Sequence, residues 1–283
     1  MNPSDVASAV QLACLLEVAS PKPGNVSPGR AFGDMRYEDF LASAAAIGPA
    51  FLLADQQGLG ATILAAVEAT RRWTAANTNL GLVLLLAPLA HGVLRRGEGP
   101  LRDGVRSVLQ STTVDDARLA YQAIRLAAPG GLGTADRQDV TDEPDIPLRD
   151  AMGLAAGRDA IASEYATGFA ITFDIGAPTL TAALDAGLEW PDAAVQTSLT
   201  ILAHRRDTLI ERKLGRDASD AVSREAAEVL ASGGMRTEAG RKRLAQFDTG
   251  LRDRANRRNP GTTADLTAAA LFVVIIERGL RVS

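Results

Sequence analysis

The chain has 283 residues, with 30 Lys and Arg against 34 Asp and Glu, and its net charge of −4 argues against a duplex-DNA-binding protein. Because 46 % of the residues are hydrophobic, the chain can bury a large core, which excludes intrinsic disorder. Its one cysteine, Cys14, excludes a disulfide framework and a cysteine-based zinc site.

The start of the chain lacks the basic stretch of a secretion signal. The longest apolar run, residues 80–90, is shorter than the roughly 20 residues that span a bilayer. We therefore expect a cytoplasmic protein whose partners are small molecules, with neither nucleic acid nor membrane among them. A homodimer is the assembly that we keep as a candidate.

Apolar residues recur at helical spacing along most of the chain, and the alternation typical of strands is almost absent. The helical segments, in chain order, are residues 4–19, 37–54, 61–74, 81–95, 101–109, 113–128, 148–159, 163–173, 179–186, 191–204, 217–231, 237–257 and 262–278. Because the helical pattern over residues 101–109 is weak and residues 148–204 fit three or four helices, these segments predict an all-α fold of about ten to twelve helices, in one domain spanning residues 1–283. Residues 131–147 are charged and rich in turn formers, which predicts a lid or a surface loop.

Two loops carry more polar residues than the connections of a helix bundle need. In residues 20–26, prolines on both sides fix Lys22, which predicts either a phosphate contact or a plain turn with an exposed lysine. In residues 77–79, Asn77 and Asn79 flank a threonine before an apolar helix. One such residue is enough for an N-cap, so this run also predicts contacts to an anion or a ribose.

Two later segments place charges beside apolar residues. Residues 205–213 combine Asp207 with Arg212 and Lys213, which suits either a magnesium-bound polyphosphate or a solvated helix end. In residues 259–266, Thr262 and Asp265 have the spacing of a capping box. Because the helix that follows is apolar, Asp265 is also predicted to face inward, where a carboxylate needs a metal, a cation or a donor.

Taken together, these segments resemble the triphosphoribosyl-dephospho-CoA synthase family. The matching runs are EVASPKPGNV (17–26), GDM (33–35), DFLASA (39–44), NTNLG (77–81), DTLI (207–210) and NPGTTADL (259–266). The resemblance implies an all-α enzyme in which the 2′-hydroxyl of 3′-dephospho-CoA attacks C1′ of the ATP ribose and adenine leaves. The product of the family becomes the prosthetic group of an acyl carrier subunit of citrate lyase or malonate decarboxylase.

This reaction needs carboxylates at the reacting ribose, and Mg²⁺ with cations at the triphosphate. The predicted catalytic carboxylates are Asp34, Asp207 and Asp265. The predicted metal ligands are Glu17, Asp207 and Asp265. The predicted ATP contacts are Lys22, Asn25, Asn77, Asn79, Arg212, Lys213 and Asn259.

The sequence departs from the better-known members of this family. They carry Asn-Thr-His-Lys-Gly where this chain has Asn79 and Leu80 in place of His and Lys. Two alternatives therefore stay open. One is a related nucleotide-dependent ribosyl or phosphoryl transferase in the assembly of one-carbon cofactors such as tetrahydromethanopterin. The other is a non-catalytic helical protein that binds nucleotides.

Overall fold

The computed structural model describes residues 1–130, 133–135, 137–253 and 255–279, and in these residues it has fourteen α-helices and no strand. The predicted all-α fold is confirmed, with slightly more helices than expected. The helices are α1 (Pro3–Ala19), α2 (Tyr37–Leu52), α3 (Leu59–Arg71), α4 (Leu80–Arg95), α5 (Leu101–Gln110), α6 (Val114–Ala127), α7 (Leu148–Ala155), α8 (Ala160–Thr167), α9 (Ala177–Asp185), α10 (Trp190–His204), α11 (Thr208–Leu214), α12 (Arg216–Ala231), α13 (Glu238–Leu251) and α14 (Gly261–Glu277). A π-helical turn (Thr172–Gly176) precedes α9, and a 3₁₀ turn (Gly234–Arg236) precedes α13.

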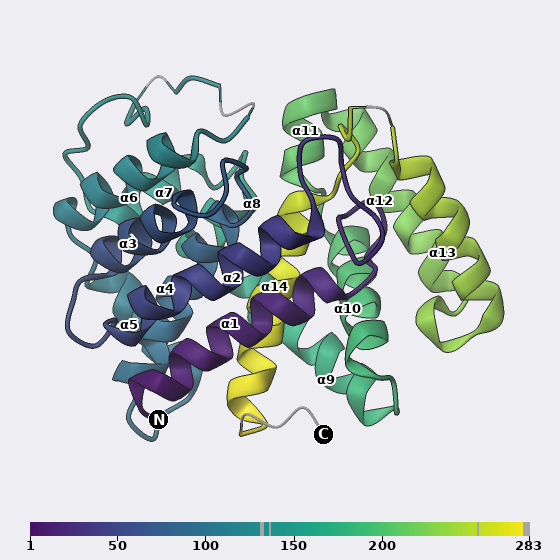
Figure 1. Cartoon of the computed structure of the whole chain (residues 1–283), viewed down its shortest axis with the longest axis horizontal. Helices are drawn as coiled ribbons and strands as arrows, with labels where there is room; N and C mark the ends of the chain where they lie inside the picture. Colours follow the sequence, from purple (N-terminus) through teal and green to yellow (C-terminus); the bar gives the residue numbers. More distant parts are fainter. Residues whose placement is uncertain (131–132, 136, 254, 280–283) are drawn as a thin grey trace.

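The last helix, α14, runs through the middle of the molecule (Figure 1). It packs against α1, α4 and α10. Every residue from Leu266 to Ile276 is buried, as expected for a helix that is apolar on all sides. No described helix is both long and apolar enough to cross a membrane.

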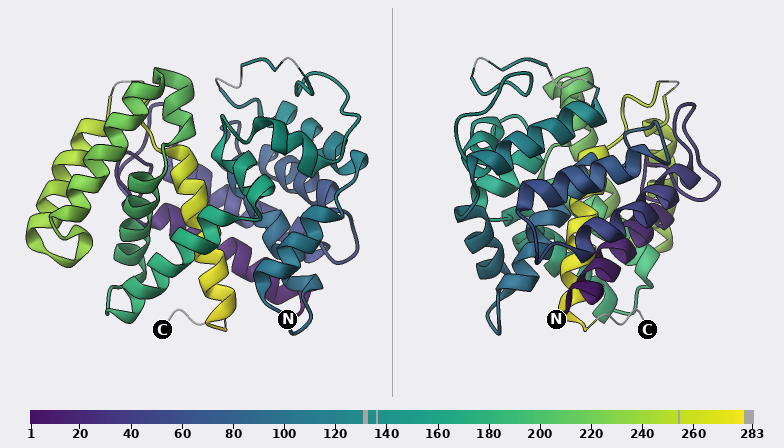
Figure 2. Two further views of the ribbon diagram at one scale, coloured as in Figure 1. Left: turned by 180° about the vertical axis from the view of Figure 1, so that it is seen from behind. Right: turned by 60° about the vertical axis from the view of Figure 1, so that its left-hand side comes forward.

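The core has two parts. The larger cluster joins α1–α9 to α14, and the smaller one joins α10 to α11, α12 and α13. Figure 2 shows α12 and α13 side by side at the edge of the molecule, away from α3–α6. The loops and helix ends that carry the polar segments lie where the two parts meet, so packing of the core sets their relative positions.

The sequence predicted no separate helix over residues 208–214, where the structure has α11. This helix has only seven residues, which is too short for an apolar period to be recognised. It forms because Asp207 caps its first turn and because Ile210 packs into the smaller core cluster. The predicted loop over residues 131–147 lies partly outside the described residues, and its described part is not helical.

The buried His91 on α4 makes stability depend on pH. Its side chain is 1 % exposed, and its Nε2 lies 3.0 Å from Oγ1 of Thr62. Burial, assisted by the charge of Arg95, lowers the pKa of His91 from 6.5 to about 4. Between pH 6.5 and about 4, the unfolded chain therefore binds a proton at His91 that the folded chain does not bind. The free energy of unfolding should fall as the pH drops from 6.5 towards 4, by at most about 3 kcal/mol from this group.

Denaturant titrations of the wild type and of His91→Gln between pH 4 and 7.5 measure this effect. The difference between the two proteins should be constant above pH 6.5 and should shrink as the pH falls below it. Parallel curves for the two proteins would show that His91 is not the source of the pH dependence.

Candidate active site

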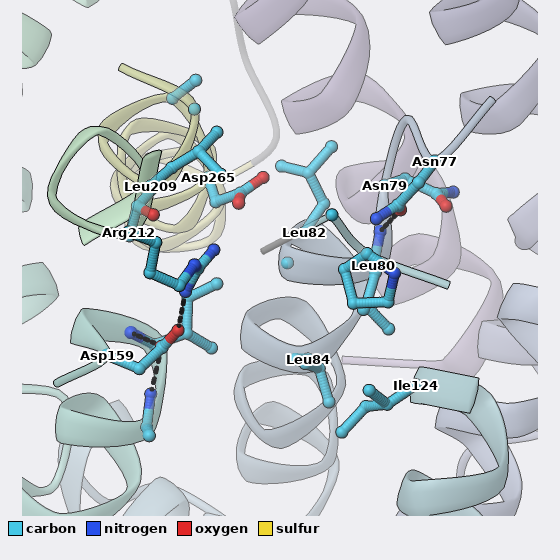
Figure 3. Close-up of a pocket in the computed structure, with 18 of the residues that line it drawn as sticks. Asn77, Asn79, Leu80, Leu82, Leu84, Ile124, Asp159, Leu209, Arg212 and Asp265 are labelled. Carbon is cyan, nitrogen blue, oxygen red and sulfur yellow. Dashed lines mark hydrogen bonds and ion pairs between the residues drawn. The ribbon is translucent and has the colours of Figure 1, made fainter. Parts of the chain in front are cut away.

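A cavity of about 1320 Å³ lies between the N-terminal ends of α4 and α14 and the helices α7, α8 and α11 (Figure 3). Nine of the eleven predicted site residues line it: Glu17, Asn25, Asp34, Asn77, Asn79, Arg212, Lys213, Asn259 and Asp265. Lys22 and Asp207 do not line it. The structure therefore does not place these two predicted site residues at the cavity surface.

Lys22 lies behind the cavity wall. Its side chain is fully buried, and its Nζ pairs with Oε1 of Glu17 at 2.8 Å. It also donates to the carbonyl oxygens of Glu17 and, at 3.2 Å, Ser20. An ammonium group has three donors, and here three oxygen atoms receive them. Lys22 thus neutralises Glu17 and fixes the loop after α1.

Asp207 is a buried carboxylate that joins two helix starts. Its Oδ1 accepts from the backbone N–H groups of Leu209 at 2.9 Å and Ile210 at 3.1 Å, which caps α11. Its Oδ2 accepts from the backbone N–H of Thr263 at 2.7 Å and from the Thr263 hydroxyl at 2.8 Å, which caps α14. Burial raises the pKa of Asp207, and these hydrogen bonds oppose the shift. Both oxygens are used for structure.

The carboxylate of Asp265, unlike that of Asp207, is not used to hold helices together. It points into the cavity from the first turns of α14 (Figure 3). Its side chain forms no hydrogen bond or ion pair with any residue in the described part of the chain, so the predicted capping box with Thr262 is absent. A Cβ added to Gly81 would lie 2.0 Å from its Oδ2, which shows that the carboxylate rests on the backbone at the start of α4. Burial raises the pKa of Asp265 well above its ordinary value, and the charges of Glu17 and Asp207 add to the effect.

The guanidinium group of Arg212 lies on the same side of the cavity as Asp265 (Figure 3). Its Nη1 donates to Oδ2 of Asp159 at 2.5 Å, while its buried Nε has no partner among the described residues. The other oxygen of Asp159 caps α8 through the N–H groups of Ile161 and Ala162 at 2.8 and 3.1 Å. Asp159 was not predicted as a site residue, because in sequence it is one charge at the end of an ordinary helical segment.

Two more polar side chains beside Arg212 have few partners. Partial burial lowers the pKa of Lys213, and the negative charges of Asp207 and Asp34 oppose this shift. The buried Oδ1 of Asn259 accepts no hydrogen bond from the described residues. Because buried polar groups are normally satisfied, the unpaired Oδ1 of Asn259 and Nε of Arg212 indicate where a polar ligand binds.

The opposite wall carries the asparagine pair. Oδ1 of Asn77 accepts from the backbone N–H of Leu80 at 3.3 Å, and Nδ2 of Asn79 donates to Oγ1 of Thr70 at 2.8 Å. The N-cap residue of α4 is Asn79, whose side chain makes no cap hydrogen bond, whereas Asn77 bonds to the N–H of the first residue of the helix. Figure 3 shows both amides on the cavity wall facing the side of Arg212 and Asp265.

The predicted metal ligands do not form a ready metal centre. No group of three or more His, Cys, Asp or Glu side chains within the described ranges is placed to hold a metal ion. Glu17 is paired with Lys22, and four donors occupy Asp207. Of the three predicted ligands, only Asp207 has both carboxylate oxygens engaged within the described chain.

Comparison with known proteins shows the family of this chain. A sequence model of the ATP:dephospho-CoA triphosphoribosyl transferase family matches residues 3–282. The chain belongs to this family. The resemblance found in the sequence motifs is therefore confirmed.

Several members of the family are similar to this chain in sequence or structure. The 2-(5″-triphosphoribosyl)-3′-dephosphocoenzyme-A synthase of Klebsiella pneumoniae is 29 % identical, over 92 % of this chain and 91 % of that protein. A probable enzyme of the same name from Pseudomonas aeruginosa is 30 % identical over 56 % of this chain and 54 % of that protein. A crystal structure of a candidate triphosphoribosyl-dephospho-CoA synthase from Archaeoglobus fulgidus superposes with a TM-score of 0.66 and 31 % identity, covering 85 % of this chain and all of that one.

Proposed function

We propose that this protein transfers the triphosphoribosyl group of ATP to the 2′-hydroxyl of 3′-dephospho-CoA and releases adenine. Membership of the family supports the reaction, and one observation supports its location. The Asp265 carboxylate faces a large cavity and has no partner in the described chain; Arg212 lies on the same side of this cavity, which Lys213 also lines. An unsatisfied carboxylate next to cations suits a phosphorylated sugar whose C1′ must react.

The triphosphate binds at Arg212 and Lys213. Nε of Arg212 has no acceptor among the described residues, and the exposed ammonium of Lys213 lies 3.5 Å from the carbonyl oxygen of Asn256, so both can donate to phosphate oxygens. The amides of Asn25, Asn77 and Asn259 line the same cavity and can bond to the ribose and the base. Lys22 acts indirectly, by holding Glu17 and the loop that carries Asn25.

The chemistry exchanges one bond at C1′ for another. The bond from C1′ to adenine breaks, the bond from C1′ to the acceptor oxygen forms, and the ribose passes through an oxocarbenium-like state. The acceptor hydroxyl loses a proton, and the departing adenine gains one. Asp265 accepts the hydroxyl proton, because its raised pKa makes its carboxylate a stronger base than an ordinary aspartate.

The donor set also fits Mg²⁺ delivered with ATP. Magnesium in nucleotide enzymes is commonly held by one or two carboxylates plus substrate phosphates. The free oxygens of Asp265 meet this requirement, whereas both oxygens of Asp207 are engaged and Oε1 of Glu17 pairs with Lys22. The ion would neutralise charge on the triphosphate. The cytoplasmic location, the homodimer and the single domain stay predictions.

Gly81→Ala should disable the site without unfolding the protein. The added Cβ would lie 2.0 Å from Oδ2 of Asp265, so the carboxylate must move away from its position. We expect turnover to fall by about tenfold or more, since small displacements of reacting groups are costly. Gly153→Ala on α7 is the control, because its Cβ would meet nothing within 4 Å. Equal activity of the two variants would show that the position of Asp265 is not critical.

The nucleotide products of a reaction with MgATP and 3′-dephospho-CoA test the proposed function. Chromatography should show free adenine, formed only when the acceptor is present. Formation of ADP without adenine would contradict the proposal and indicate phosphoryl transfer. Adenine formed only with a different hydroxyl compound would keep the ribosyl transfer and replace the acceptor.

A further inference from the structure

The cavity is larger than one substrate needs. Its volume of about 1320 Å³ exceeds the roughly 300–1,000 Å³ of a typical small-molecule site. The site residues discussed above account for only part of the wall. Figure 3 shows Leu84 and Ile124 apart from Asp265 and from Asn77 and Asn79. This leaves an apolar part of the cavity that the reaction at C1′ does not use.

The edge formed by α7 and α8 changes in polarity along its length. Met152 and Leu154 line the cavity first, and Leu154 is 52 % exposed although it is a leucine. Arg158 follows, and then comes Asp159, which pairs with Arg212. In sequence order, the residues of this edge that line the cavity therefore run from apolar side chains to a cation and then to the ion pair with Arg212.

This apolar end is held in shape by hydrogen bonds. The Tyr121 hydroxyl donates to the backbone carbonyl of Gln138 at 2.7 Å, and Nη1 of Arg125 donates to that of Val140 at 2.7 Å. Nη1 of Arg158 donates to the carbonyl of Thr134 at 3.3 Å, which uses one of the five donors of a guanidinium. The backbone at Gln138 and Val140 is thus tied to α6, and Arg158 keeps donors for a ligand.

We infer that this end of the cavity binds the pantetheine arm of the acceptor, with Arg158 on the acceptor's diphosphate; the inference rests on the proposed function. The acceptor consists of an adenosine with the reacting 2′-hydroxyl, then a diphosphate, then the pantetheine arm. With the hydroxyl at Asp265, the diphosphate reaches Arg158, and the arm extends over Leu154 and Ile124. The charge and polarity of the wall thus follow those of the acceptor in the same order.

Calorimetric titration of the full-length protein with 3′-dephospho-CoA, without ATP, tests this assignment. Leu154→Asn and Arg158→Gln should each weaken binding by about tenfold or more, because one loses apolar contact and the other a charged donor. The affinity for MgATP should stay within about twofold. Leu52→Asn is the matched control, since Leu52 is 46 % exposed on α2 and does not line the cavity.

Three results would overturn the assignment of this end of the cavity to the pantetheine arm, here called the arm site. They are a wild type that does not bind 3′-dephospho-CoA, a Leu154→Asn protein that binds it as the wild type does, and a loss of MgATP affinity equal to the loss for the acceptor. 4′-Phosphopantetheine should displace 3′-dephospho-CoA from the wild type but should not displace MgATP. A wild type that shows this binding pattern but releases no adenine would contradict the proposed function and leave the arm site standing.

Discussion

Asp265→Asn should lower the turnover of adenine release by two or more orders of magnitude, on the order of 3 kcal/mol or more of transition-state stabilisation. Asn keeps the size of the side chain but can neither accept a proton nor bind Mg²⁺ as a carboxylate does. The fold should survive, because the Asp265 carboxylate makes no hydrogen bond within the described chain that Asn would lose. Its pKa is raised by burial and neighbouring acids, so loss of its charge also removes repulsion. Turnover and thermal unfolding measure the two effects separately.

Leu266→Ala is the control for this variant. Leu266 follows Asp265 on α14 and is 2 % exposed, so its truncation leaves a cavity in the core. It should cost roughly 2–5 kcal/mol of stability, with activity in proportion to the folded fraction. An Asp265→Asn protein with wild-type turnover would remove Asp265 from the mechanism and weaken the assignment of the whole site.

Asp207→Ala should have the largest effect on stability. The substitution leaves the N–H groups of Leu209, Ile210 and Thr263 without their acceptor at the starts of two helices. We expect the free energy of unfolding to fall by about 3–5 kcal/mol, since each buried donor left unpaired carries its own penalty. Activity should fall only as far as folding does or as α11 shifts. Denaturant titration measures the change.

Thr237→Ala provides the comparison, because Thr237 is an exposed N-cap that accepts from one backbone N–H, that of Gly240. Its removal should cost about 1 kcal/mol, the usual value for one cap. Asp207→Asn should lie between the two, because it keeps one acceptor oxygen. If Asp207→Ala were no more destabilising than Thr237→Ala, Asp207 would not be the link between α11 and α14.

Much of the fold could be predicted, because apolar periodicity is a local property. The continuous apolar run after Asp265 predicts a buried helix, and α14 is one. Polar runs that local structure does not explain also predicted nine residues of the cavity wall, including Asn77 and Arg212. The sequence therefore indicated which segments meet at the site.

The state of each charged group could not be predicted in the same way. Asp207 and Asp265 looked equivalent in sequence, but Asp207 is satisfied by Thr263, 56 residues away, and Asp265 by no described residue. Lys22 looked available for phosphate until its pairing with Glu17 was seen. Such differences depend on tertiary contacts, which no local pattern encodes.

The mass of the acceptor after reaction tests the central claim most directly. When the wild type is incubated with MgATP and 3′-dephospho-CoA, the acceptor should gain one triphosphoribosyl group, with one adenine released for each product formed. Asp265→Asn, folded as the wild type, should form this product at least a hundredfold more slowly, on the order of 3 kcal/mol. An acceptor that gains only a phosphoryl group, or an Asp265→Asn protein that forms the product at the wild-type rate, would contradict the claim.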